Sequence, residues 1–118
     1  MGVRRKAIGN ITVLQISGEL WGGDETEQFR KAIMDEAATG NTRLVFDISD
    51  CSNMNSTGLG VFAEALRNYS SRNGSIKLAG SQKKMTNLLV MTRLIGYFGH
   101  YATVEEAIAS FSESPASA

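Results

Sequence analysis

The chain has 118 residues, with 12 Lys and Arg against 12 Asp and Glu, so its formal charge is zero with the single histidine neutral. Hydrophobic residues make up 42% of it, the balance of one ordinary globular domain. A neutral total argues against a general nucleic-acid binder, which would carry a basic excess. One cysteine excludes an internal disulfide and, with one histidine, argues against a structural zinc site. No apolar run approaches the ~20 residues of a membrane span or resembles a signal peptide, so we expect a cytoplasmic domain. We also expect that the domain binds no cofactor.

The first part of the chain predicts a β-hairpin followed by a helix. Residues 3–8 and 11–17 read as strands, and Gly9-Asn10 between them is a two-residue turn pair that tolerates positive φ. Asp24 is expected to cap a helix, because apolar residues with helical spacing follow it. Gly40 is expected to end that helix.

The rest of the chain alternates between strands and helices. Residues 43–48 are a short apolar run typical of a strand covered on both faces, and a polar loop over residues 49–55 follows. The later expected elements are a helix from about Ser56, a strand at 75–80, a helix capped by Ser81, a strand at 97–101 and a last helix begun by the capping box of Thr103 and Glu106. The order β-β-α-β-α-β-α-β-α predicts an α/β fold, a mixed β-sheet of four to five strands covered by about four helices. We expect one domain over residues 1–111 and a disordered tail over residues 112–118, which has nothing to bury.

The start of the second helix carries the candidate chemistry. The first backbone N–H groups of a helix lack intrahelical partners, and the helix dipole adds partial positive charge there. A phosphate on Ser56 would meet those donors. Gly58 and Gly60 have no side chains, so another protein's backbone or a nucleotide could approach them closely. The alternative is that Ser56 only caps the helix, a contribution of about 1 kcal/mol.

This segment resembles the STAS domain, specifically the small single-domain anti-sigma factor antagonists of bacteria. The typical family segment is a strand ending Asp-hydrophobic-Ser, a short loop, a hydrophobic residue, and then Asp-Ser-Ser/Thr-Gly-Leu-Gly. This chain has Asp47-Ile48-Ser49 and, after the loop, Met54-Asn55-Ser56-Thr57-Gly58-Leu59-Gly60. The resemblance extends from Val13 to Phe111.

The resemblance implies a binding module with no catalytic residues of its own. In this family the unmodified protein binds an anti-sigma factor that is also a serine kinase, which releases the sigma factor for transcription. The kinase phosphorylates the serine at the helix start, and a serine phosphatase removes the phosphate. Ser56 matches that serine, and the partner face lies at the Ser56 loop and the neighbouring third helix. Its expected residues are Asn55, Ser56, Thr57, Gly58, Leu59, Gly60 and Met85.

One departure leaves alternatives open. Asn55 stands where the family usually has Asp, which removes a repulsion from the phosphate of roughly 1 kcal/mol at 4 Å in water and also a group that a kinase could recognise. The second hypothesis is therefore a STAS subunit that is not phosphorylated and binds the ATPase of a lipid ABC transporter. A third, a small nucleotide-binding or hydrolytic enzyme, rests only on the glycines.

Four further residues bear on these hypotheses. Trp21, in a glycine-flanked loop, either packs on the core or anchors a partner. Met91 on the third helix is expected in the core, unless it is exposed and suits an adaptable partner surface. Cys51 is expected to be a small buried filler and His100 a strand residue without a catalytic partner.

Overall fold

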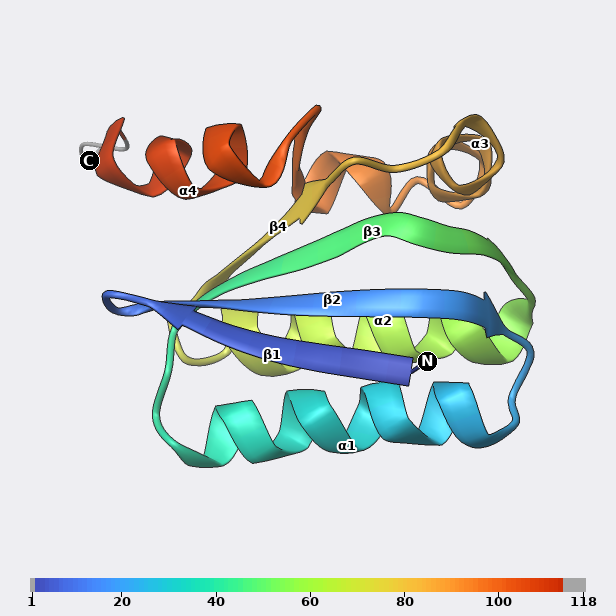
Figure 1. The fold of residues 1–118 in the computed structure, drawn as a ribbon, viewed down its shortest axis with the longest axis horizontal. Coiled ribbons are helices and arrows are strands. Elements are labelled where there is room, and N and C mark those ends of the chain that lie inside the picture. Colours follow the sequence, from blue (N-terminus) through green and yellow to red (C-terminus); the bar gives the residue numbers. More distant parts are fainter. Residues whose placement is uncertain (1, 114–118) are drawn as a thin grey trace.

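A computed structural model describes residues 2–113 of the chain (Figure 1). The strands are β1 (Gly2–Ile8), β2 (Ile11–Leu20), β3 (Arg43–Met54), β4 (Ser75–Ala79) and β5 (Gly99–Tyr101). The helices are α1 (Asp24–Ala38), α2 (Ser56–Ser70), α3 (Lys83–Met91) and α4 (Val104–Glu113), with a short 3-10 turn, η1 (Ile95–Tyr97), before β5. This order confirms the predicted alternation and the α/β class. Within residues 2–113, no helix combines the length and the apolar character that crossing a bilayer requires.

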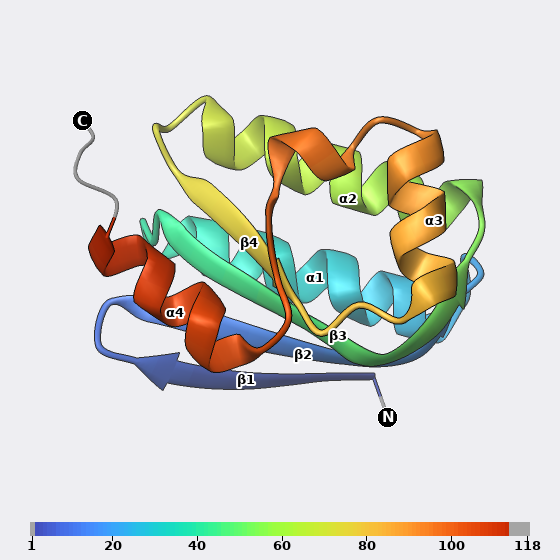
Figure 2. The same cartoon turned by 90° about the horizontal axis from the view of Figure 1, so that it is seen from above.

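The strands form one mixed sheet in the order β1-β2-β3-β4-β5. β1 and β2 pair antiparallel from Gly2↔Ser17 to Ile8↔Ile11, as the turn pair predicts, and the remaining neighbours pair parallel. Helices α1 and α2 cover one face of the sheet and α4 covers part of the other (Figures 1 and 2). Because β2 and β3 both lead into helices on the same side, their ends and the starts of α1 and α2 lie together at one end of the sheet (Figure 1).

Strands β2 and β3 are longer than predicted. The expected polar loop at residues 49–55 is wrong for most of its length, because β3 stays paired with β2 as far as Leu20↔Met54. The parallel register shifts twice along this stretch, between Gln15 and Ser17 and again after Gly18. These irregularities change the spacing of the buried residues of β3 from two to three, which gives Ile48, Cys51 and Met54. A period of three is not a strand pattern, so the sequence alone could not show that the strand continues.

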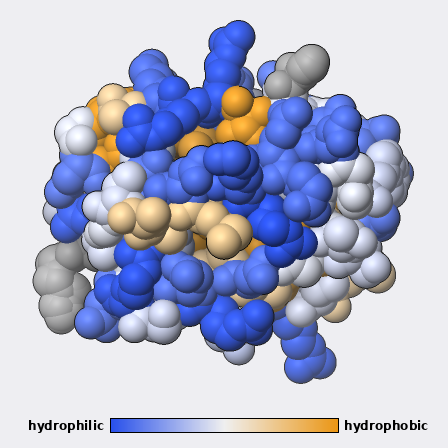
Figure 3. Space-filling model, turned by 90° about the horizontal axis from the view of Figure 1, so that it is seen from below, coloured by the Kyte–Doolittle hydropathy of each residue, from blue (hydrophilic) through white to orange (hydrophobic). Residues whose placement is uncertain are grey.

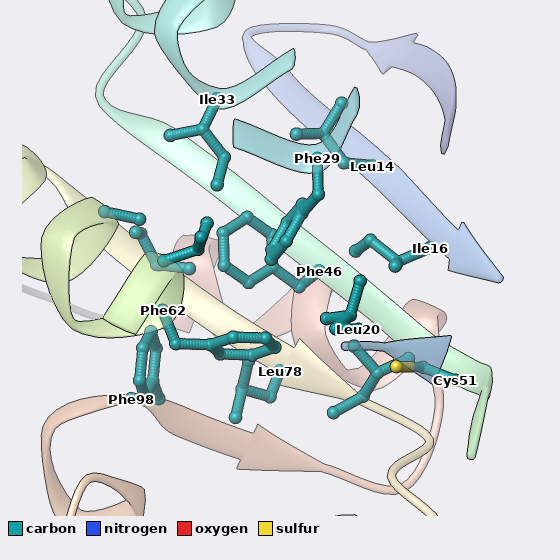
Figure 4. Close-up of a cluster of buried hydrophobic side chains, with 14 of the residues drawn as sticks. Leu14, Ile16, Leu20, Phe29, Ile33, Phe46, Cys51, Phe62, Leu78 and Phe98 are labelled. Atoms are coloured by element: carbon teal, nitrogen blue, oxygen red, sulfur yellow. The ribbon is translucent and has the colours of Figure 1, made fainter. Parts of the chain in front are cut away.

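Four phenylalanines hold the layers together (Figure 4). Phe46 from the centre of the sheet packs edge-to-face against Phe29 of α1 and Phe62 of α2, with ring centroids 5.0 and 5.5 Å apart. Phe98, just before β5, closes the cluster 6.0 Å from Phe62. Edge-to-face pairs of this kind add about 0.5–1.5 kcal/mol each to the burial of their area. The cluster therefore fixes α2 on the sheet, and with it the position of Ser56.

The helix ends confirm some predicted signals and correct others. Gly40 follows α1 with φ +85°, and Thr103 Oγ1 accepts a hydrogen bond from the Glu106 N–H at 3.1 Å, as expected. Asp24 does not cap α1: Gly23 occupies the N-cap, and Asp24 is the first helical residue, where its charge faces the positive end of the dipole. Gln82, not Ser81, occupies the N-cap of α3.

Helix α4 also corrects the predicted end of the domain. It continues to Glu113, so residues 112 and 113 are helical and the expected disorder there is wrong. The remaining residues of the predicted tail, 114–118, lie outside the described part of the chain.

One buried charge, Glu36 of α1, was not anticipated from the sequence. Its carboxylate accepts hydrogen bonds from Arg5 Nε at 2.7 Å, Thr12 Oγ1 at 2.6 Å and Asn41 Nδ2 at 2.9 Å. Burial by itself would raise the pKa of Glu36, but these hydrogen bonds and the Arg5 charge outweigh it and lower the pKa to about 2. The network ties α1 to β1 and β2, so Arg5 is part of the fold as well as a charge on an edge strand.

Candidate functional site

Asn55, not Ser56, caps helix α2. Asn55 Oδ1 accepts hydrogen bonds from the backbone N–H groups of Thr57 at 3.0 Å and Gly58 at 3.2 Å. Ser56 is the first helical residue, and its side chain is exposed. Among residues 2–113 we find no hydrogen bond that uses the Ser56 hydroxyl. The alternative in which Ser56 serves as the helix cap is therefore wrong, and its oxygen is accessible at the start of α2.

The same cap corrects the expected role of the helix amides. A phosphate on Ser56 was expected to meet N–H groups without partners, but those of Thr57 and Gly58 already donate to Asn55. The helix dipole still favours an anion here, and the first turn of α2 contains no acidic residue. The start of α2 therefore offers an anion a favourable helix dipole, without a set of free amides that would draw a phosphate into the domain.

The two glycines of the motif lie in different environments. A Cβ on Gly58 would come within 2.8 Å of the Leu20 carbonyl oxygen and 2.9 Å of Met54 Cβ, so Gly58 packs against the ends of β2 and β3. Contrary to what the sequence suggested, Gly58 is therefore not a position that a partner's backbone or a nucleotide can approach closely. Gly60 is exposed, and a Cβ there would meet no atom within 4 Å. Gly60 alone of the two presents bare backbone at the surface.

The remaining predicted residues divide between core and surface. Thr57 is exposed, and Leu59 is partly buried against the core. Met85 of α3 is fully buried, so its side chain has no surface with which to meet a partner. Met91, later in α3, is 77% exposed. The two views of the ribbon place α3 at the end of the sheet where β3 leads into α2 (Figures 1 and 2).

The loop between β2 and α1 joins this site. Asn55 Nδ2 donates to the carbonyl oxygen of Trp21 at 2.8 Å, and the Asn55 N–H donates to the Leu20 carbonyl at 3.1 Å. The Trp21 side chain is 48% exposed, so it does not pack fully on the core. The sequence could not show that residues 34 positions apart meet, because the meeting depends on how far β2 and β3 run side by side.

His100 lies in β5, as expected, and its ring forms a hydrogen bond with a serine. Its Nε2 lies 2.7 Å from Ser81 Oγ, which also contacts Thr86 Oγ1. Thr86 Oγ1 also lies 3.1 Å from the Gln82 carbonyl oxygen, which accepts from it. The chain of hydrogen bonds holds the start of α3 against β5.

Cys51 is a buried filler, as predicted. It is fully buried at the end of β3, and burial, reinforced by the charge of Glu19, raises its pKa to about 11. A thiol in this state is a poor nucleophile and a poor metal ligand. Nowhere in the described residues do three or more His, Cys, Asp or Glu side chains gather as a metal site would require.

Several solved structures share this fold. A Thermotoga maritima protein described as a candidate anti-sigma factor antagonist is 26% identical, with a TM-score of 0.85 over 92% of each chain. The anti-sigma factor antagonist SpoIIAA in its unphosphorylated form is 22% identical, with a TM-score of 0.72 over 94% of this chain and 98% of its own. The phosphorylated form of SpoIIAA, from Bacillus, is 23% identical, with a TM-score of 0.75 over 93% of this chain and 99% of its own.

The fold is also shared outside that group. A sulfate transporter family protein from Wolinella succinogenes is 15% identical, with a TM-score of 0.76 over 89% of this chain and 87% of its own. Comparison with curated protein sequences gave no match. The family model of the STAS domain matches residues 3–107, which includes all of the sheet except Gly2 and extends into the start of α4. The chain therefore belongs to the STAS domain family.

Proposed function

We propose that this chain is an anti-sigma factor antagonist that binds an anti-sigma factor with serine kinase activity and is switched off by phosphorylation of Ser56. The observation that carries the proposal is the position of the Ser56 hydroxyl, exposed at the start of α2, where Asn55 already caps the helix. A hydroxyl that the fold does not need is free to be modified without unfolding the domain. The chain acts as a binding module and a kinase substrate, without catalysis of its own.

The proposed partner surface combines the start of α2 with the exposed side of α3. From α2 it includes Asn55, Ser56, Thr57 and Gly60. From α3 it includes Val90 and Met91, two apolar side chains that are 53% and 77% exposed. Methionine is flexible enough to adapt its shape to a partner, so its exposure on α3 favours a contact there. A serine phosphatase would restore binding by removing the phosphate from Ser56.

Charge alone is enough to operate this switch. A hundredfold loss of affinity requires about 2.7 kcal/mol. A phosphate adds roughly −1.5 to −2 charges at pH 7. To transfer it, the kinase must bring the phosphates of ATP against Ser56, so the phosphoserine afterwards faces the phosphates of ADP. Two unit charges 4 Å apart repel by about 4 kcal/mol at an intermediate effective dielectric. No large conformational change in this domain is required.

The acceptor is tested by mass. Anti-sigma factors of the serine-kinase class from the source organism are purified and incubated one by one with the chain and ATP, and its intact mass is measured. We expect one added phosphate on the wild type and on Thr57→Ala, the matched control at the adjacent exposed hydroxyl. Ser56→Ala should gain none. A phosphate on Ser56→Ala would show that the acceptor lies elsewhere.

The switch is tested by affinity. Titration calorimetry of the same kinase should give at least about tenfold weaker binding for Ser56→Asp, because it places a carboxylate where the phosphate would stand. Ser56→Asn has nearly the same size as that variant but no charge, and it should bind within about threefold of the wild type. Equal affinities for the two variants would exclude charge as the cause.

Asn55 supports one other function, that of a STAS subunit that binds a lipid ABC transporter ATPase and needs no phosphate. Both polar atoms of its side chain serve the fold, one in the helix cap and one on the Trp21 carbonyl. Co-purification of a transporter ATPase, with no kinase able to phosphorylate the chain, would favour this function. Either function places the chain in the cytoplasm.

A further inference from the structure

The loop that carries Trp21 forms one surface with the start of α2. Asn55 donates from Nδ2 to the Trp21 carbonyl at 2.8 Å. The next residue, Gly22, lies so close that a Cβ on it would touch the Thr57 side chain at 3.4 Å. Trp21 therefore belongs to the same surface as Ser56, although 34 positions separate Trp21 from Asn55.

Asn55 connects the two segments in a way that aspartate could not. Its Oδ1 accepts from the Thr57 and Gly58 amides while its Nδ2 donates to Trp21. An aspartate would keep the cap, but it has no hydrogen to donate and would place a charged oxygen against the Trp21 carbonyl. The asparagine that departs from the family pattern thus fixes the loop in place.

The indole is held at the surface by a hydrogen bond to the end of β2. Trp21 Nε1 donates to Glu19 Oε1 at 2.9 Å, and the side chain remains 48% exposed. Tryptophan is among the residues most enriched at the energetic centres of protein interfaces, because it buries a large rigid area at little cost in side-chain entropy. A tryptophan that is held in position before binding loses even less entropy when a partner covers it.

The charges around Trp21 indicate the chemistry of its partner. Residues 19–29 contain Glu19, Asp24, Glu25 and Glu27 and no lysine or arginine. All four carboxylates are exposed, and the nearest following cation, Arg30, pairs with Glu27 at 3.7 Å and with Glu64. An apolar pocket with a basic rim would match this surface, since opposite potentials across an interface steer association.

We propose that Trp21 is the main anchor of the partner interface, inserting into an apolar pocket with an Arg- or Lys-rich rim on the anti-sigma factor, and that Asn55 is the positioning residue that holds it there. The inference rests on the proposed function, since the partner is the same kinase. It adds a contact residue outside the phosphorylated motif and assigns a role to the unusual asparagine.

Trp21→Ala tests the anchor. Titration calorimetry against the kinase should show at least about thirtyfold weaker binding than the wild type, the loss typical of a central interface tryptophan. Met34→Ala is the matched control, because Met34 is an exposed apolar side chain on α1, ten residues from the helix start. It should bind within about twofold of the wild type. The α1 and α2 side of the molecule is mostly hydrophilic, with only small apolar patches (Figure 3).

Asn55→Asp tests the positioning role, with a readout that helix stability does not change. Trp21 is the single tryptophan of the chain, so its fluorescence reports this loop alone. Acrylamide should quench it about 1.5- to 2-fold more efficiently in Asn55→Asp, and affinity for the kinase should fall about three- to tenfold. Ser56→Ala, which leaves the contact between Asn55 and Trp21 intact, should show the wild-type quenching constant.

The basic rim proposed for the partner is tested by measuring how salt changes the rate of association. Asp24→Asn combined with Glu25→Gln should slow association with the kinase several-fold at low ionic strength and reduce its salt dependence. An unchanged association rate with the same salt dependence would show that the partner has no basic rim at this surface.

The outcomes separate this inference from the proposed function. If the kinase phosphorylates Ser56 and Trp21→Ala still binds within about twofold of the wild type, the anchor is wrong and the proposed function stands. If Asn55→Asp leaves quenching unchanged, the positioning role is wrong. If no kinase of this class binds the wild type, both proposals fail together.

Discussion

The α-carbon of Gly58 sits so close to Leu20 that a Cβ on the glycine would come within 2.8 Å of the Leu20 carbonyl oxygen and of its Cβ. The first turn of α2 thus rests directly on the last residue of β2. Leu20 is fully buried and fixed by strand pairing, so the backbone on that side cannot move aside. The position of Ser56, two residues earlier, depends on this close approach.

Replacing Gly58 should therefore destabilise the domain. Gly58→Ala places a methyl group inside the contact distance of backbone and Cβ atoms, and overpacking of this kind costs about 1–3 kcal/mol of unfolding free energy. Gly60→Ala, in the same turn, meets no atom within 4 Å and should stabilise the helix by up to about 1 kcal/mol. Urea denaturation of both variants measures the difference. Equal effects would mean that Gly58 does not face β2.

The effect of replacing Asn55 on stability should depend on whether the new side chain keeps an oxygen that can cap α2. Asn55→Ala removes the oxygen that accepts from Thr57 and Gly58, and should lower the unfolding free energy by about 1 kcal/mol. Asn55→Asp keeps that oxygen but loses the donor to the Trp21 carbonyl, so its stability should lie between those of the wild type and the alanine variant. Thermal unfolding followed by circular dichroism measures both. If the alanine variant were as stable as the wild type, the cap would not contribute to folding.

Glu36 should make the free energy of unfolding depend on pH in the acid range. Its pKa is lowered to about 2 in the folded chain, so its contribution is fully present above the unfolded value of 4.5. It is lost as the pH falls from about 4.5 towards 2, since the unfolded state binds the proton first. The shift corresponds to about 3 kcal/mol at neutral pH. Glu36→Gln should flatten the stability profile across this pH window, as urea titrations from pH 2 to 7 would show.

Asp35→Asn is the control for that experiment. Asp35 precedes Glu36 on the same helix, but its ion pair with Lys31 at 3.0 Å is exposed on both sides. Exposed pairs contribute about 0–1 kcal/mol, so this variant should keep the wild-type dependence on pH. If Asp35→Asn flattened the profile as much as Glu36→Gln, the dependence would not come from the buried carboxylate.

Cys51 should resist alkylation in the folded protein. Because burial raises its pKa to about 11, very little thiolate exists at pH 8, and the sulfur is also inaccessible. We expect iodoacetamide to label it at least about a hundredfold faster in 6 M guanidinium chloride than in buffer. Intact mass against time measures both rates. Fast labelling without denaturant would show that the end of β3 opens easily.

The sequence by itself determined the order of elements and the helix that begins at Ser56. Both depend on local rules, because turn pairs, helical spacing and caps act between residues a few positions apart. The STAS segment from Asp47 to Gly60 is read in the same way, since its residues are contiguous. For that reason the class of fold and the candidate phosphorylation site follow from the order of the amino acids alone.

Tertiary structure alone decided what each residue of that segment faces. Whether Gly58 faces solvent or the core depends on how far β3 runs beside β2, and the two register shifts remove the alternating pattern by which the sequence would show that length. Met85 is buried because α3 packs onto the core. Asn55 meets Trp21 and Arg5 meets Glu36 across 34 and 31 positions. Pairs so distant are brought together only by the packing of the sheet and its helices, which no local pattern specifies.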